Sequence, residues 1–165
     1  MKKIIFQCGS VWLGISLLLW WLFFYSPLEI PPYIGIFSDS RVSVYGLILI
    51  VVLIFILRFF LKRYLRQEPE APLSDLVSVG LLSILLAEIV FQLIRQLSYT
   101  DYTPLEHLQD LMFGVFGMPL YAGAISLWIG AKLKKNKNRL IPIISISLIL
   151  LFGYVYKYLK STGVL

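Results

Sequence analysis

The chain has 165 residues, of which 59% are hydrophobic and 15% charged, and its mean hydropathy is +0.83. Soluble domains carry about a quarter charged residues, so this composition indicates a membrane protein without room for a soluble domain. The net charge of +6 points to topology and lipid headgroups rather than to nucleic acid. Single Cys and His residues, Cys8 and His107, exclude an intrachain disulfide and a multi-histidine metal or haem site. We expect no metal and no cofactor.

The first predicted span covers residues 4–25, which follow a short basic start and carry no charge. About 20 apolar residues cross the hydrocarbon core as a helix, so this run is long enough. Trp20, Trp21 and Tyr25 at its far end are typical of an aromatic belt at a membrane interface. The apolar run is long for a secretory signal and no small-x-small cleavage pattern precedes the next polar stretch, so we predict an uncleaved first helix.

The second predicted span covers residues 42–61. The preceding residues, 26–41, are expected to form a loop because three prolines prevent a regular helix there. The following residues, 62–75, are expected to form a charged linker. Ser74 or Asp75 at the end of this linker is expected to cap the third helix.

The third predicted span, residues 76–94, contains two polar side chains, Glu88 and Gln92. Together with Arg95 they lie at i, i+4 and i+7, which places all three on one face of a helix. A charged group in the hydrocarbon region costs roughly 2.5–3.5 kcal/mol or more. We therefore predict that Glu88 and Gln92 face the interior of the bundle. Two interpretations stay open, namely a structural pairing with a neighbouring helix and a binding or catalytic site; a third places Glu88 closer to water.

The fourth helix is predicted to begin at Pro104, because Thr103 to Glu106 form a capping box with proline at the first helical position. A helix from there to Leu133 would be roughly 45 Å long, so its first turns lie in the interface or Pro119 bends it. Its uncharged part, residues 111–131, is the fourth span. This part is rich in small residues, which favour helix packing over the alternative of a ligand groove: Gly114, Gly117, Ala122, Gly123, Ala124, Ser126 and Gly130.

The fifth predicted span covers residues 140–156, after a basic hinge. With the N-terminus in the cytoplasm, eleven Lys and Arg residues fall on the cytoplasmic side: Lys2, Lys3, Arg58, Lys62, Arg63, Arg66, Lys132, Lys134, Lys135, Lys137 and Arg139. Four fall on the outer side: Arg41, Arg95, Lys157 and Lys160. The positive-inside rule therefore predicts a cytoplasmic N-terminus and an outer C-terminus in a cell membrane. The chain is predicted to be a single all-α domain, residues 1–165: a polytopic integral membrane protein with a five-transmembrane-helix bundle.

This topology brings several polar residues to the outer side. The candidate ligand-binding cluster consists of Glu88, Gln92, Arg95, His107 and Asp110. Two of its members have simpler interpretations: Asp110 as a negative charge near the start of the fourth helix, where the helix dipole favours it, and His107 as an interfacial side chain.

The pattern around the third and fourth spans resembles the VanZ-like family, small membrane proteins named for a teicoplanin-resistance determinant. The residues that carry the resemblance are Asp39, Tyr45, Glu88, Gln92, Asp110, Gly114 and Gly117. The chain departs from the family pattern in that Gly114 stands where Asn is expected, the loop before Asp110 is longer, a histidine near the second span is missing, and the fifth span is additional. The resemblance covers roughly residues 20–130 and implies a bacterial cell-envelope role with no established reaction.

Several functions are compatible with these features. The first is a small cell-envelope membrane protein with a polar ligand or lipid-headgroup site open to the outer leaflet, where Arg95 pairs with an anionic headgroup and Glu88 accepts a proton. The second is a structural or accessory subunit that docks another membrane protein through Gly114, Gly117 and Gly123. The third is a small transporter component. One intramembrane acid does not define a catalytic site, so the sequence leaves enzymatic activity open.

Overall fold

The computed structural model describes residues 1–24, 40–98, 104–135 and 140–161. Within the helices, side chains are described except at 23–24, 40–47, 96, 98, 104–114, 116 and 152–161. The described residues form helices and no strands, which confirms the all-α prediction. The helices are α1 (Lys2–Phe24), α2 (Ser40–Gln67), α3 (Leu73–Ser98), α4 (Pro104–Leu133) and α5 (Leu140–Ser161).

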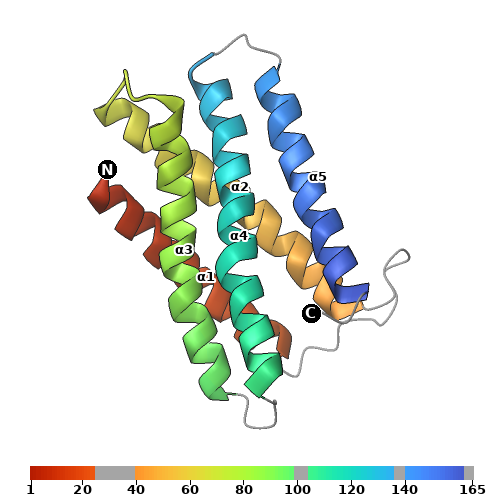
Figure 1. The fold of residues 1–165 in the computed structure, drawn as a ribbon. Helices are drawn as coiled ribbons and strands as arrows, with labels where there is room; N and C mark the ends of the chain where they lie inside the picture. Colours follow the sequence, from red (N-terminus) through yellow and green to blue (C-terminus); the bar gives the residue numbers. More distant parts are fainter. Residues whose placement is uncertain (25–39, 99–103, 136–139, 162–165) are drawn as a thin grey trace.

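The helices form a bundle in which α3 and α4 are the most closely associated pair and run antiparallel (Figure 1). α1 packs on α3 in the same direction, α5 packs on α4, and α2 crosses behind α4 and contacts α1. The start of α1, the α2–α3 connection and the end of α4 therefore lie toward one end of the bundle, here called the basic end. The ends of α1 and α3 and the start of α4 lie toward the opposite end.

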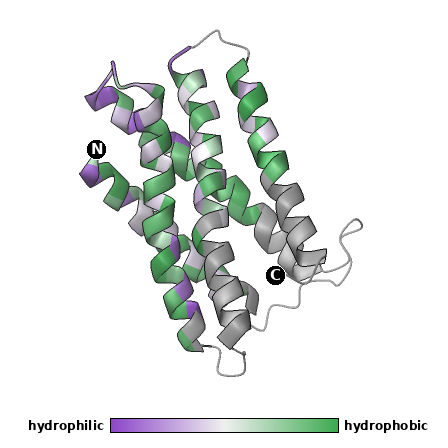
Figure 2. Cartoon of the chain, in the orientation of Figure 1, coloured by the Kyte–Doolittle hydropathy of each residue, from purple (hydrophilic) through white to green (hydrophobic). Residues whose placement is uncertain are grey.

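Among the described residues, two helical segments are long and apolar enough to cross a membrane. They are residues 2–22 of α1, with mean hydropathy 1.6, and residues 73–95 of α3, with mean hydropathy 2.3. A shorter apolar segment, residues 140–151, lies in α5. Figure 2 shows hydrophobic colour along most of the described helices, hydrophilic colour at the basic end, and hydrophilic bands within the lower half of α3.

Small residues allow α3 and α4 to approach closely. A Cβ added at Gly80 of α3 would lie 1.9 Å from Ser126 Oγ and 3.1 Å from the Ala122 carbonyl oxygen, so the Ser126 hydroxyl occupies the space that Gly80 leaves. On α4, Gly130 packs against Leu76 in the same way. The prediction that small residues of the fourth helix serve packing is confirmed at these positions.

Gly123 also belongs to the contact between α4 and α3. It is buried, and a Cβ there would contact Val77 and Leu81 of α3. Gly117 is half-buried, and nothing is described for Gly114 beyond its place in α4. A docking surface for another protein therefore cannot include Gly123 while α3 and α4 are packed together.

Two predicted boundaries were wrong. α2 continues to Gln67, because the basic residues after Leu61 are exposed while Leu61 and Tyr64 (i, i+3) are buried on the inner face of the same helix. α3 begins at Leu73, so neither Ser74 nor Asp75 is its cap, and Asp75 lies in the first turn. There it is favourable to the helix dipole and accepts a hydrogen bond from the Tyr64 hydroxyl at 3.3 Å.

The start of the fourth helix was predicted correctly. α4 begins at Pro104, where a missing backbone N–H has no cost because the first N–H groups of a helix have no partner within it. Thr103, the predicted cap, lies outside the described residues. α4 then continues through the buried Pro119 to Leu133.

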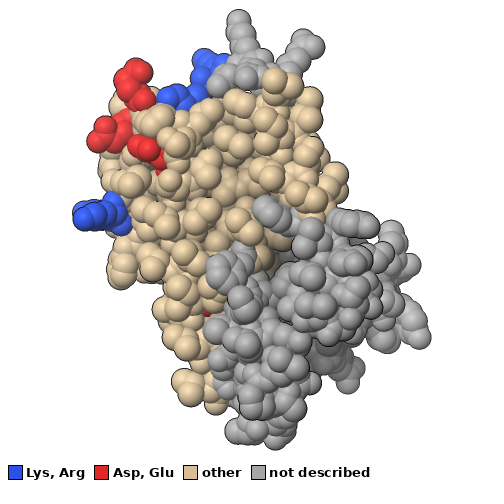
Figure 3. Space-filling model, viewed as in Figure 1, with Lys and Arg blue, Asp and Glu red and all other residues tan. Residues whose placement is uncertain are grey.

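The basic end is joined by a contact between its two connections. Lys134 Nζ donates a hydrogen bond to the carbonyl oxygen of Ala71 at 2.6 Å. The next residue, Lys135, has φ 52°, the left-handed conformation that commonly ends a helix. Figure 3 shows blue and red side chains together at this end of the molecule.

Candidate functional site

Glu88 is the central polar residue of the α1–α3 interface. Only 4% of its surface is exposed, and its Oε1 accepts a hydrogen bond from Trp12 Nε1 of α1 at 2.9 Å. The indole N–H is a donor with no acceptor capacity, so it fits a carboxylate oxygen. The prediction that Glu88 faces the interior of the bundle is confirmed, and the bond fixes α1 against α3 at this level.

Gln92 lies one helical turn beyond Glu88 and is equally buried, as predicted. Its side-chain amide donates a hydrogen bond to the Glu88 carboxyl group. Its Oε1 is buried and has no hydrogen-bond partner. An amide oxygen in this condition retains its full capacity to accept a donor, and leaving it unpaired is unfavourable by about 1–3 kcal/mol.

Ser16 of α1 is a second buried group with unused capacity. It is 2% exposed, and its hydroxyl has no hydrogen-bond partner. Two other buried serines behave differently, since Ser83 donates to the Val79 carbonyl and Ser145 donates to the Ile141 carbonyl, each four residues back in its own helix. The Ser16 hydroxyl does not use this local partner.

The helical register places Ser16 near Gln92. α1 and α3 run in the same direction, Gly9 lies against the Ser83 carbonyl, and Trp12 reaches Glu88. Ser16 lies between Trp12 and Trp20 on one face of α1, and these two contact Glu88 and Phe91, so Ser16 is at about the level of residues 88–92 of α3. We call Trp12, Ser16, Glu88 and Gln92 the Glu88 cluster. Trp20 and Phe91, with ring centroids 6.1 Å apart, pack edge to face beside it.

Arg95 is half-buried and interacts electrostatically with Glu88. The two residues are seven positions apart, or roughly 10.5 Å along the helix axis. Arg95 therefore places a positive charge between the Glu88 cluster and the far end of α3.

Two members of the predicted cluster, His107 and Asp110, belong to α4, but their side chains lie outside the described residues. The antiparallel register, in which Gly80 lies against Ser126 and Gly130 against Leu76, brings position 110 of α4 to about the level of Arg95. Asp39 lies outside the described residues, and Tyr45 belongs to α2 without a described side chain.

Trp12 and Ser16 were missed by the sequence analysis. Their spacing with Trp20, i, i+4 and i+8, marks one face of α1, and an indole N–H in an apolar helix is a donor that needs an acceptor. The pattern did not show which helix this face meets. The described residues contain no group of three His, Cys, Asp or Glu side chains that would suit a metal ion.

Comparison of the chain with protein-family models, with characterised proteins and with solved structures gives no match.

Proposed function

We propose that this chain is a polytopic membrane protein with five spans that binds a polar, hydrogen-bond-donating headgroup of an amphipathic or lipid-linked ligand at the Glu88 cluster. The VanZ-like resemblance belongs to the same proposal, as a cell-envelope role. One observation carries it: Gln92 Oε1, one turn beyond the Glu88 carboxyl group, and the Ser16 hydroxyl, one turn beyond Trp12 on α1, are both buried and have no partner. Buried polar groups are almost always paired in folded proteins, so unpaired neighbours mark a site for a further group.

The chemistry of the cluster selects the ligand. The Glu88 carboxyl and Gln92 Oε1 are acceptors, and the Ser16 hydroxyl is both donor and acceptor. A group with several N–H or O–H donors, such as a primary ammonium group, satisfies more of them than a group without donors. Arg95, farther along the same helix face, suits a neighbouring phosphate.

The binding proposal is tested with two lipids that differ only in their donors. Phosphatidylethanolamine carries a primary ammonium group, and phosphatidylcholine carries a quaternary one without N–H. Lipid adducts of the purified protein are measured by native mass spectrometry. We expect phosphatidylethanolamine to bind about tenfold or more tightly, since hydrogen bonds to charged groups are worth about 1.5–3 kcal/mol.

Glu88→Gln tests whether the cluster is responsible. The variant keeps an acceptor for Trp12 but replaces the carboxyl group by an amide, so the fold is expected to survive and the preference for phosphatidylethanolamine to disappear. Ser145→Ala is the matched control, because it removes a buried hydroxyl that is already satisfied within α5. If instead the cluster is only a structural lock, Glu88→Gln leaves the lipid preference unchanged, and the binding proposal is wrong.

The five-span topology is supported by the charges at the two ends of the bundle. The described basic residues near the start of α1, the end of α2 and the end of α4 share the basic end. We place this end in the cytoplasm. Reporter fusions after Arg66 and Arg139 are expected to score cytoplasmic, and one after Asp101 external. A cytoplasmic result at Asp101 would invert the topology.

A further inference from the structure

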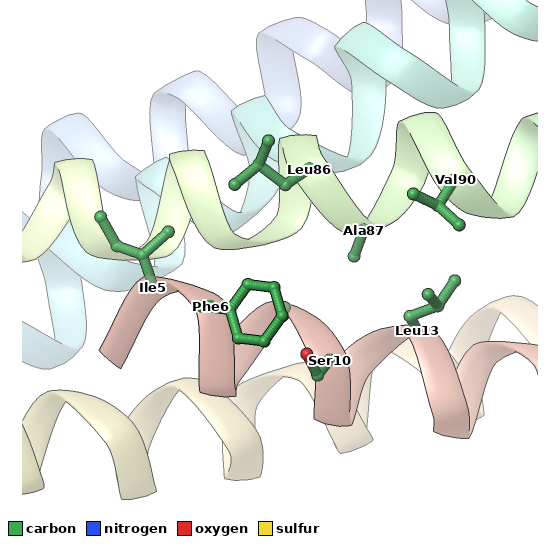
Figure 4. A pocket seen from close by; sticks show the side chains of 8 residues that line it. Ile5, Phe6, Ser10, Leu13, Leu86, Ala87 and Val90 are labelled. Carbon is green, nitrogen blue, oxygen red and sulfur yellow. The ribbon is translucent and has the colours of Figure 1, made fainter. Parts of the chain in front are cut away.

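A shallow groove of about 280 Å³ runs along the other flank of the α1–α3 contact (Figure 4). Its floor is made of small residues, Gly9, Ser10 and Ala87, and its walls of large ones, including Phe6 and Val90. The groove exists because Gly9 brings α1 against the Ser83 carbonyl of α3, leaving a furrow between the larger side chains on either side.

The groove is apolar and open to the surroundings of the protein. Phe6 is 73% exposed and Val90 is 42% exposed, and both lie within the two segments that are apolar enough to cross a membrane. Residues 5–13 of α1 rise by about 12 Å, which is long enough to hold part of one acyl chain. In a bilayer the medium at this depth is acyl chains, so an extended hydrocarbon chain matches both the shape and the chemistry of the groove.

One end of the groove carries positive charge. Lys2 lies on the same face of α1 as the groove, one turn before Phe6. The spacing shows this, because the groove residues Phe6, Gly9 and Leu13 follow Lys2 at i+4, i+7 and i+11. Lys3 is adjacent, and both lysines are exposed. A basic residue at a membrane surface attracts anionic headgroups by about 1 kcal/mol.

We propose that this groove binds an anionic phospholipid of the leaflet at the basic end, with its phosphate group at Lys2 and one acyl chain along Gly9 and Ser10. The site is separate from the Glu88 cluster, since α3 turns Leu86 and Val90 toward the groove and Glu88 toward the interior. The groove therefore holds a structural lipid that seals α1 to α3, independently of the ligand proposed for the cluster.

The test uses the full-length protein in nanodiscs that contain phosphatidylglycerol and phosphatidylcholine with identical acyl chains. Native mass spectrometry after release from the nanodiscs counts the lipid molecules retained. We expect at least one phosphatidylglycerol to be retained in preference to phosphatidylcholine. Ser10→Phe, which fills the floor from α1, and Val90→Trp, which fills it from α3, are each expected to reduce this retention about tenfold.

Gly14→Phe is the matched control for adding a ring to α1, since a Cβ at Gly14 has nothing within 4 Å.

Lys2→Gln is expected to reduce the preference for phosphatidylglycerol about fivefold, the equivalent of one surface charge, whereas Lys62→Gln on α2 leaves it unchanged. Circular dichroism verifies that each variant is helical. Equal retention in Ser10→Phe, Val90→Trp and Gly14→Phe would overturn the proposal, as would indifference to Lys2→Gln.

Discussion

Both interfaces of α3, with α4 and with α1, use a glycine to bring two helices close together, but they differ in the polar groups that they bury. Toward α4, Gly80 receives the Ser126 hydroxyl, and the contact is tight and largely apolar. Toward α1, Gly9 receives the Ser83 carbonyl, but the next turns bring Trp12, Glu88 and Gln92 together and leave polar capacity unused. Glycine gives close approach in both, and the buried Ser126 hydroxyl on the α4 side also has no hydrogen-bond partner, but only the α1 interface contains a carboxyl group. The difference teaches that a carboxyl group with unpaired polar groups around it, rather than close packing or a single unpaired hydroxyl such as that of Ser126, distinguishes a candidate site from scaffold.

The largest effect is expected from Gly9→Ala. An added Cβ would lie 2.7 Å from the Ser83 carbonyl oxygen, which belongs to the backbone and moves only if α1 and α3 separate. We expect a loss of about 2–3 kcal/mol in the free energy of unfolding, the upper range for overpacking. Unfolding in mixed detergent and denaturant measures it. Gly14→Ala, whose Cβ meets nothing, is expected to be neutral or slightly stabilising. Equal results at positions 9 and 14 would show that α1 does not pack through Gly9.

Gly80→Ala tests the α4 side. The added Cβ collides with the Ser126 side chain, which is more adaptable than a backbone carbonyl, so the expected loss is about 1–2 kcal/mol. The double variant Gly80→Ala with Ser126→Gly exchanges the two sizes across the interface and is expected to recover most of the loss. Failure of the second change to rescue the first would contradict the interlock, as measured by the same unfolding assay.

The Trp12–Glu88 bond is tested with a double-mutant cycle of Trp12→Phe and Glu88→Leu. Each single change leaves the other buried residue without this hydrogen bond and is expected to cost about 1–3 kcal/mol, part of it from lost packing. The double variant removes both partners and should lose less than the sum, with a coupling of about 1.5 kcal/mol. A coupling of zero would mean that the two helices are held by packing alone on this side as well.

The smallest effect is expected outside both interfaces, at the basic end. Tyr64→Phe removes a long hydrogen bond to Asp75 and should cost about 0.5–1 kcal/mol. Burial and then the Asp75 carboxylate raise the pKa of the Tyr64 phenol, so the bond persists at neutral pH and is lost only as the pH rises through that raised pKa. Ultraviolet titration of wild type and Tyr64→Phe identifies the late-ionising phenol. If Tyr64 titrates at the ordinary pKa of a free phenol, the proposed contact with Asp75 is contradicted.

Much of the site was predictable because it follows from local rules. The i, i+4 spacing of Glu88 and Gln92 and the cost of a carboxylate in hydrocarbon were sufficient to predict their shared, inward face. The Pro104 helix start likewise followed from a capping pattern within four residues. The linker and third-helix cap were mispredicted because burial of Tyr64 extends α2 past its basic residues, which charge alone does not reveal.

The sequence by itself determined that the chain is helical and apolar, where its costly polar groups lie, and how its basic residues alternate between connections. These properties depend on periodicity and composition, which are local properties of the amino-acid sequence. Only the tertiary structure decided that Trp12 is the partner of Glu88, that Ser16 lies at about the same level, and that Gly9 opens a groove on the opposite flank. Such pairings depend on which faces of distant helices meet. In this chain they are set by close approach at single glycines, as for Gly9 and Ser83, which are 74 positions apart, and for Gly80 and Ser126, which are 46 positions apart.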